Sequence, residues 1–234
     1  MQSSSKFAIL CLCAGLVSAG TAPPGLPKVA HPLAEGTWNW VGTTTMGDQS
    51  RDVGVTVEVK AVADTWVIRH VVSTPGRPDA IDTAVLDKDT MECIKREAQQ
   101  GPLSVKLDTK AGKITGTITM GERTMPVDRD AGGALFADGI AARQSIIALP
   151  LADGYTATFR TFDLQSMKTK MVELKVAGTE KITVPAGSFE ALRIETHALD
   201  GTPEPMTLWM DKASRKLVKM TATVGPATIS AELK

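Results

Sequence analysis

An alternation of apolar and other residues with a period of two is the strongest constraint on the fold of this chain. It is clearest at residues 53–59, which read Val-Gly-Val-Thr-Val-Glu-Val. Successive side chains of a β-strand point to opposite faces of the sheet, so this pattern predicts a strand with one buried face and one solvated face. A chain built from such segments folds as a sheet that packs on one side.

The same pattern recurs along the chain at the spacing of β-hairpins. Turn segments such as Pro75-Gly76 and Asp87-Lys88-Asp89 separate the runs, and such short loops join antiparallel neighbours. No helical segments alternate with the runs, as a parallel sheet would require. The sequence therefore predicts a mainly β, antiparallel protein with strands at 37–44, 53–59, 65–74, 80–86, 91–98, 103–108, 114–120, 154–162, 171–176, 181–184, 191–197, 206–210, 217–223 and 227–233.

One segment near the middle of the chain has the features of a helix. We expect Asp138 to cap a short helix over residues 140–149, whose isoleucine-rich side packs on the sheet. Pro150 would end it, because the residue before a proline avoids the α conformation.

An internal repeat lies on either side of this helix. Leu86-Asp87-Lys88-Asp89-Thr90 resembles Met210-Asp211-Lys212-Ala213-Ser214. The same offset pairs residues 57–72 with 181–196, so that Ala63-Asp64 and Gly187-Ser188 become equivalent turns. The sequence predicts two similar β-meander halves, about residues 53–120 and 177–234, joined by a loop-helix segment at 129–150.

The first twenty residues have the layout of a secretory signal peptide. Lys6 precedes an apolar run at residues 7–17, and Ala19 and Gly20 offer a cleavage site. A lipidated Cys11 or Cys13 is the alternative, although each follows a leucine rather than a small residue.

The prolines of residues 21–35 predict a linker, followed by a single β domain at 36–234. We expect an exported protein, periplasmic or extracellular, with no integral membrane span after cleavage of the leader.

The charge balance disfavours polyanionic partners. The chain has 26 basic and 26 acidic residues without a run of like charge, so we expect no binding to nucleic acid. The chain contains no phosphate loop, dinucleotide fingerprint or Gly-x-Ser-x-Gly motif, so we expect neither a cofactor nor a catalytic site.

Histidine and cysteine give little indication of a metal site. His70 and His197 fall in strands that the repeat makes roughly equivalent, which would let them approach each other. They are fewer than the three or four ligands of a usual zinc site, so we expect no metal. Cys93 is the only cysteine beyond the leader, and we interpret it as a small buried residue rather than a reactive thiol.

Four tryptophans are the candidate ligand-binding residues. Trp38 and Trp40 share one face of the first strand, Trp66 lies in the third strand, and Trp209 precedes the Asp211 turn. Large aromatic side chains of this kind line apolar pockets. The alternative is that they fill the core of a protein that is otherwise poor in aromatic residues.

Several motifs resemble a large, uncharacterised family of exported bacterial β-proteins. They are Val-Pro-Ala-Gly-Ser-Phe at 184–189, Leu-Trp-Met-Asp at 208–211 and the basic hairpin at 214–219. That family is similar to the lipoprotein-localisation factors LolA and LolB. The resemblance implies an incompletely closed antiparallel barrel with a helix over its mouth and, by analogy, a concave apolar face that holds acyl chains.

These observations favour an exported, non-catalytic module that binds a lipid or other apolar ligand on a concave sheet face. The alternative is a scaffold of the cell envelope, which would bind a partner protein through a sheet edge or a loop. An enzyme that uses His70 and His197 beside a carboxylate such as Glu195 is less favoured than either.

Overall fold

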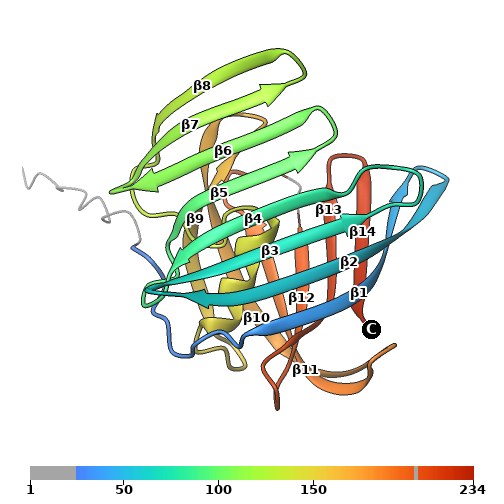
Figure 1. The fold of residues 1–234 in the computed structure, drawn as a ribbon. Helices are drawn as coiled ribbons and strands as arrows, with labels where there is room; N and C mark the ends of the chain where they lie inside the picture. The colour runs from blue at the N-terminus through green and yellow to red at the C-terminus, as the bar shows by residue number, and fades with distance from the viewer. Residues whose placement is uncertain (1–24, 203–204) are drawn as a thin grey trace, which may run out of the picture.

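The structure is a computed structural model that describes residues 25–202 and 205–234. The expected signal peptide at 1–20 lies outside these residues. The described chain forms fourteen strands in one antiparallel sheet (Figure 1). The strands are β1 (Gly36–Met46), β2 (Gln49–Val62), β3 (Thr65–Ser73), β4 (Ala80–Asp87), β5 (Cys93–Gln100), β6 (Leu103–Lys110), β7 (Lys113–Met120), β8 (Arg123–Asp130), β9 (Thr156–Asp163), β10 (Lys168–Val184), β11 (Gly187–Ala198), β12 (Met206–Asp211), β13 (Leu217–Val224) and β14 (Ala227–Leu233).

The sheet consists of two meanders that meet where β1 pairs with β14. The strand order runs from β8 down to β1, continues into β14, and then runs down to β9. In the central pair, Trp40 of β1 lies opposite Leu233 of β14. The terminal strands of the sheet, β8 and β9, do not pair with each other. The predicted mainly β, antiparallel and incompletely closed barrel is therefore confirmed.

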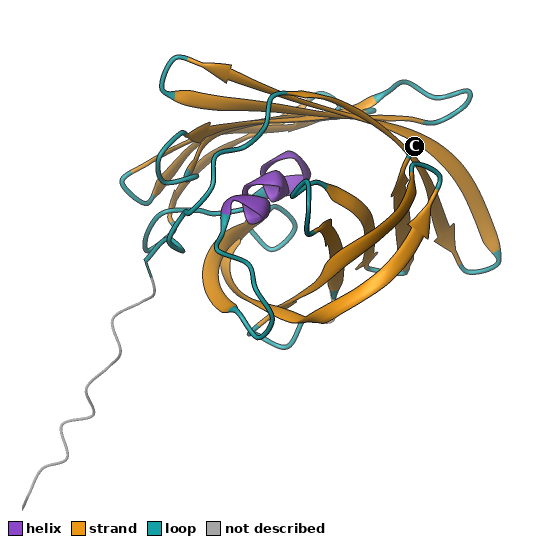
Figure 2. Cartoon of the chain, turned by 90° about the horizontal axis from the view of Figure 1, so that it is seen from below, coloured by secondary structure: helices purple, strands orange, loops and turns teal. Residues whose placement is uncertain are grey.

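A single helical segment lies between the two meanders and within the curve of the sheet (Figure 2). It begins as α1 (Gly139–Ala142) and continues as a 3-10 helix, η1 (Arg143–Ala148). The predicted short helix is thus confirmed, and Asp138 occupies the predicted N-cap position, but its side chain does not cap the helix. Asp138 precedes the helix, yet its carboxylate accepts a hydrogen bond from the Phe162 N–H at 2.7 Å instead.

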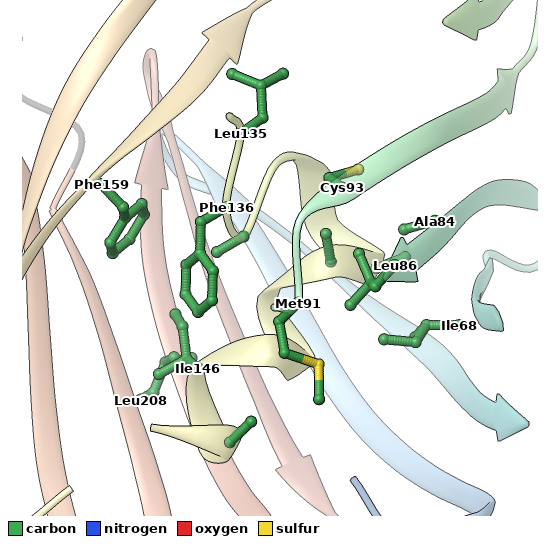
Figure 3. Packing of buried hydrophobic residues seen from close by; sticks show 14 of the residues in the cluster. Ile68, Ala84, Leu86, Met91, Cys93, Leu135, Phe136, Ile146, Phe159 and Leu208 are labelled. Atoms are coloured by element: carbon green, nitrogen blue, oxygen red, sulfur yellow. The ribbon is translucent and has the colours of Figure 1, made fainter. Parts of the chain in front are cut away.

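The core fills the space between the concave sheet face and the helical segment. The alternation predicts it correctly, because Val55, Val57 and Val59 all have less than a tenth of their surface exposed. At its centre, the rings of Phe136 and Phe159 lie 5.2 Å apart at 59° (Figure 3). Tilted aromatic pairs of this kind add stability beyond the area they bury.

Two strands differ from the prediction. β8 was missed, because its single buried residue, Val127, leaves no apolar alternation to detect and Pro126 interrupts the segment. The expected strands at 171–176 and 181–184 are one continuous strand, β10, with an irregularity in its pairing between Val176 and Gly178. Such a bulge shifts the alternation and makes one strand look like two.

The expected equivalence of the first hairpin turns is also wrong. Ala63-Asp64 is a turn, but Gly187 and Ser188 lie within β11, and the corresponding turn falls at 185–186. The Asp87 and Asp211 turns do match, as discussed below. The hairpin β10–β11 is therefore longer than its counterpart β2–β3.

Candidate ligand-binding cavities

Two cavities of similar size lie beside the helical segment. One, of about 270 Å³, is called the tryptophan cavity. It is lined by residues 31–34, Trp38, Trp40, Val59, Gln144, Ile147 and residues 214–217. The other, of about 280 Å³, is lined mainly by β9–β13, the helical segment and Arg96; it is called the polar cavity. Both are hollows between side chains of the described chain.

The strand β1 places two tryptophans in the first cavity. Trp38 and Trp40 lie two residues apart on the same face, opposite Val57 and Val55 of β2. Trp40 is buried with 7% of its surface exposed, and Trp38 is half-buried. Together with Val59 of β2, they give the cavity an apolar wall.

The N-terminal segment forms another wall of the tryptophan cavity. Residues 25–35, expected as an extended linker, have no regular secondary structure but pack on the domain. Leu33 is 5% exposed. The N–H groups of Ala30 and His31 donate to the Ala148 carbonyl at 2.9 and 3.0 Å. This segment therefore contributes to the cavity rather than only leading to the domain.

Arg215 joins the cavity to the end of the 3-10 helix. It follows the Asp211 turn with a φ of 56°. Its Nη2 donates to the Ile147 carbonyl at 2.5 Å and to the Leu149 carbonyl at 2.8 Å, which satisfies carbonyls left free at the helix end. Burial lowers the pKa of Arg215. The sequence indicates the basic hairpin but not this role of Arg215, because the role depends on which segment lies opposite.

The other two candidate tryptophans lie elsewhere. Trp66 is buried in the core at 5% exposure, and the Lys88 ammonium lies 5.3 Å from the centre of its ring. Trp209 faces away from the main core: its indole N–H donates to Glu180, and the Lys219 ammonium lies 5.8 Å from its ring. The structure therefore brings Trp38 and Trp40 together at a cavity and places Trp66 and Trp209 outside it.

The polar cavity lies beside a buried ion-pair network. Arg96 of β5 pairs with Asp82 of β4 at 3.0 Å and approaches Asp138 at 3.7 Å. Gly139 packs so closely on the Arg96 guanidinium that an added Cβ would lie 2.3 Å from Nε. Burial raises the pKa of Asp138. The network ties the start of the helical segment to the N-terminal half of the sheet, which is a structural task.

The two histidines have separate partners. His70 lies opposite Asp82 in the β3–β4 pair, and burial lowers its pKa to about 4. His197 is exposed, and its Nε2 lies 3.4 Å from Glu173. Glu195 pairs with Arg193 at 3.2 Å. Within residues 25–202 and 205–234, no three or more His, Cys, Asp and Glu side chains gather as metal ligands would.

Cys93 is a buried free thiol. It is 1% exposed, and burial raises its pKa, so the thiol stays protonated at neutral pH. This position agrees with the interpretation of Cys93 as a small buried residue.

No helix in the described part of the chain is long and apolar enough to cross a membrane.

No protein with a curated description matches the chain. Among solved structures, the hypothetical lipoprotein YmcC from Escherichia coli K12 is similar at 9% identity and a TM-score of 0.36, over 84% of this chain and 83% of that one. These comparisons do not confirm the resemblance to LolA and LolB. A family model matches residues 35–233, and the chain therefore belongs to the family described as protein of unknown function DUF3108.

Proposed function

We propose that this protein is an exported, non-catalytic binding module that takes an apolar ligand, such as a lipid acyl chain, into the tryptophan cavity. The observation that carries the proposal is the cavity itself, because much of its lining is apolar. Its walls include Leu33, Trp38, Trp40, Ile147 and Leu217. Burial of apolar ligand surface against such walls is favourable by roughly 25 cal/mol per Å².

The size of the cavity limits what it can hold. At about 270 Å³ it is slightly smaller than the usual small-molecule sites, which measure roughly 300–1,000 Å³. It would therefore hold a small apolar molecule or part of a longer chain. Residues 31–34 form one wall of this space, and they are held in place by the hydrogen bonds of Ala30 and His31 to Ala148 and by the buried Leu33.

The two edge strands of the sheet, β8 and β9, favour this proposal over an envelope scaffold that binds a partner by pairing with an edge strand. The edge strand β8 contains Pro126, which cannot donate a ladder hydrogen bond, and four charged residues, Arg123, Asp128, Arg129 and Asp130. Proline and charge are the usual protection of an edge against pairing. At the other edge, the Phe136 N–H already donates to the Arg160 carbonyl of β9 at 2.9 Å.

The proposal is tested with the mature protein and dodecanol as an apolar probe, by native mass spectrometry and calorimetry. Trp38→Glu places a charge in the cavity wall and should lower the affinity by at least about tenfold, a cost of roughly 1.4 kcal/mol. Trp209→Glu makes the same change outside the cavity and should leave the affinity unchanged. Absence of binding to the wild type at saturating dodecanol, or equal losses in both variants, would contradict the proposal.

A further inference from the structure

The charges around the tryptophan cavity favour a ligand that has an anionic group as well as an apolar part. Arg215 and Lys216 line it, whereas its lining residues include no aspartate or glutamate. In the polar cavity, by contrast, Asp138 and Asp163 lie among the cationic residues, and Lys170 pairs with Asp163 at 2.7 Å. Of these two cavities, only the tryptophan cavity therefore has positively charged side chains in its lining without any negatively charged ones.

We infer that the ligand of the tryptophan cavity is an anionic amphiphile, whose carboxylate or phosphate head binds to Arg215 and Lys216 while its apolar part lies against Trp38 and Ile147. This inference rests on the proposed function and specifies its ligand class.

Arg215 retains hydrogen-bonding capacity for such a head group. A guanidinium has five N–H donors, and Nη2 supplies the two bonds to the Ile147 and Leu149 carbonyls. Its Nε is buried without a partner among the described residues. Since both N–H groups of Nη2 are engaged by these carbonyls, an anion would bind mainly through Nη1, which has no hydrogen-bond partner among the described residues, by charge-assisted hydrogen bonds. A partly buried cation without a carboxylate partner is costly, so a ligand anion would stabilise it.

The turn that carries Arg215 does not itself require an arginine. The equivalent position of the Asp87 turn is Met91, with nearly the same φ, 57° against 56°. Met91 is fully buried in the core. Since either side chain fits this backbone, the choice of arginine at 215 must reflect what surrounds it, which is the helix end and the cavity.

The test compares ligands that differ only in the head group. Dodecanoate and dodecyl phosphate should each bind the wild type at least about tenfold more tightly than dodecanol, and the preference should shrink as salt screens the exposed Lys216. Equal affinities for the alcohol and the anions would overturn the inference and leave the proposed function standing. Failure of all three to bind would overturn the proposed function.

Variants locate the head group. Arg215→Met copies the residue of the Asp87 turn and should reduce the preference for anions to the roughly two- to fivefold that Lys216 supplies, while dodecanol still binds. Lys216→Gln, at an exposed position, should reduce the preference by about two- to fivefold, as expected for a partly screened charge. Lys212→Gln is the matched control, since Lys212 belongs to the same turn but pairs with Glu190 at 2.8 Å and does not line the cavity. An unchanged preference in Arg215→Met, or an equal loss in Lys212→Gln, would contradict the assignment.

Discussion

The Asp87 and Asp211 turns, one in each half of the sheet, share a backbone and differ in the residue that ends them. In each, the aspartate carboxylate accepts a hydrogen bond at 2.8 Å from the N–H three residues later, that of Thr90 or Ser214. Each is followed by a residue with positive φ, Met91 or Arg215. The predicted repeat is therefore reproduced here at the level of single hydrogen bonds.

The final residue of each turn has a different task. Met91 packs its side chain into the core between the sheet and the helical segment (Figure 3). Arg215 donates to the end of the helix and borders the tryptophan cavity. The comparison shows how a repeated turn can serve packing in one copy and a polar site in the other, because the backbone does not dictate the side chain.

The largest expected effect is on packing at the first turn. Met91→Ala removes a fully buried side chain and should lower the free energy of unfolding by about 2–5 kcal/mol. Arg215→Ala should cost less, since the side chain is only partly buried. Urea denaturation of both variants measures the difference. Equal losses would mean that the two positions serve the same purpose.

The second-largest effect is expected at His70 of β3, which has a counterpart in β11 of the other half. The pairing places His70 opposite Asp82 where the other half has Thr196 opposite Met206. Burial lowers the pKa of His70 from 6.5 to about 4. As the pH falls, His70 is therefore protonated in the unfolded chain before it is protonated in the folded chain. The contribution of neutral His70 to the free energy of unfolding is complete above about pH 6.5 and is lost as the pH falls to about 4.

The gap between the two pKa values corresponds to about 3 kcal/mol. His70→Thr, which copies the other half, should therefore make stability less dependent on pH between 4 and 6.5. Denaturation of wild type and variant across this range measures the effect as a difference, because the charged neighbours Asp82 and Arg143 are present in both. Parallel pH profiles would show that His70 is not protected from protonation in the folded state.

A smaller effect should come from the aspartates themselves. Asp87 accepts hydrogen bonds from the Thr90 hydroxyl and two N–H groups, and Asp211 accepts two from Ser214. Replacing either by alanine should cost about 1–2 kcal/mol of unfolding free energy. Guanidinium denaturation tests this, with the conservative Asp→Asn variants as controls that keep one acceptor. A negligible cost at one turn alone would show that the two are not energetically equivalent.

The smallest effect should come from the lysines of the two turns. Lys88 lies over Trp66, and Lys88→Gln should cost about 0.5–1 kcal/mol. Lys212 pairs with exposed Glu190, and Lys212→Gln should cost at most about 1 kcal/mol. In a Trp66→Leu background the effect of Lys88→Gln should shrink, and a thermal denaturation cycle measures whether it does.

The sequence predicts those features that depend on local pattern. The alternation at 53–59 and the turn at Asp87 predict a strand and a hairpin correctly. β8 escaped detection because an exposed edge strand needs little apolar alternation. The bulge near Gly178 is not predicted, because one extra residue reverses the apolar alternation without changing the composition of the segment.

The candidate site is only partly visible in the sequence. A strand period places Trp38 and Trp40 on one face, which the sequence shows directly. That Trp209 faces the other way from the core follows from its position between Leu208 and Met210, which are both buried. The contacts of Arg215 and of residues 30–33 with the helical segment join positions far apart in the chain, and no local pattern encodes them.

The pairing of β1 with β14 has a consequence for the order in which the protein can fold. The first and last strands of the domain meet in the middle of the sheet, so each meander can form from local contacts while their junction waits for the final residues of the chain. Closing so large a loop is slow compared with forming hairpins. We expect pulse-labelled hydrogen exchange during refolding to protect amides of the β6–β7 and β10–β11 hairpins before those of β1 and β14. A chain that lacks residues 227–233 would therefore hold two unjoined sheets, because β14 is the strand that pairs with both β1 and β13.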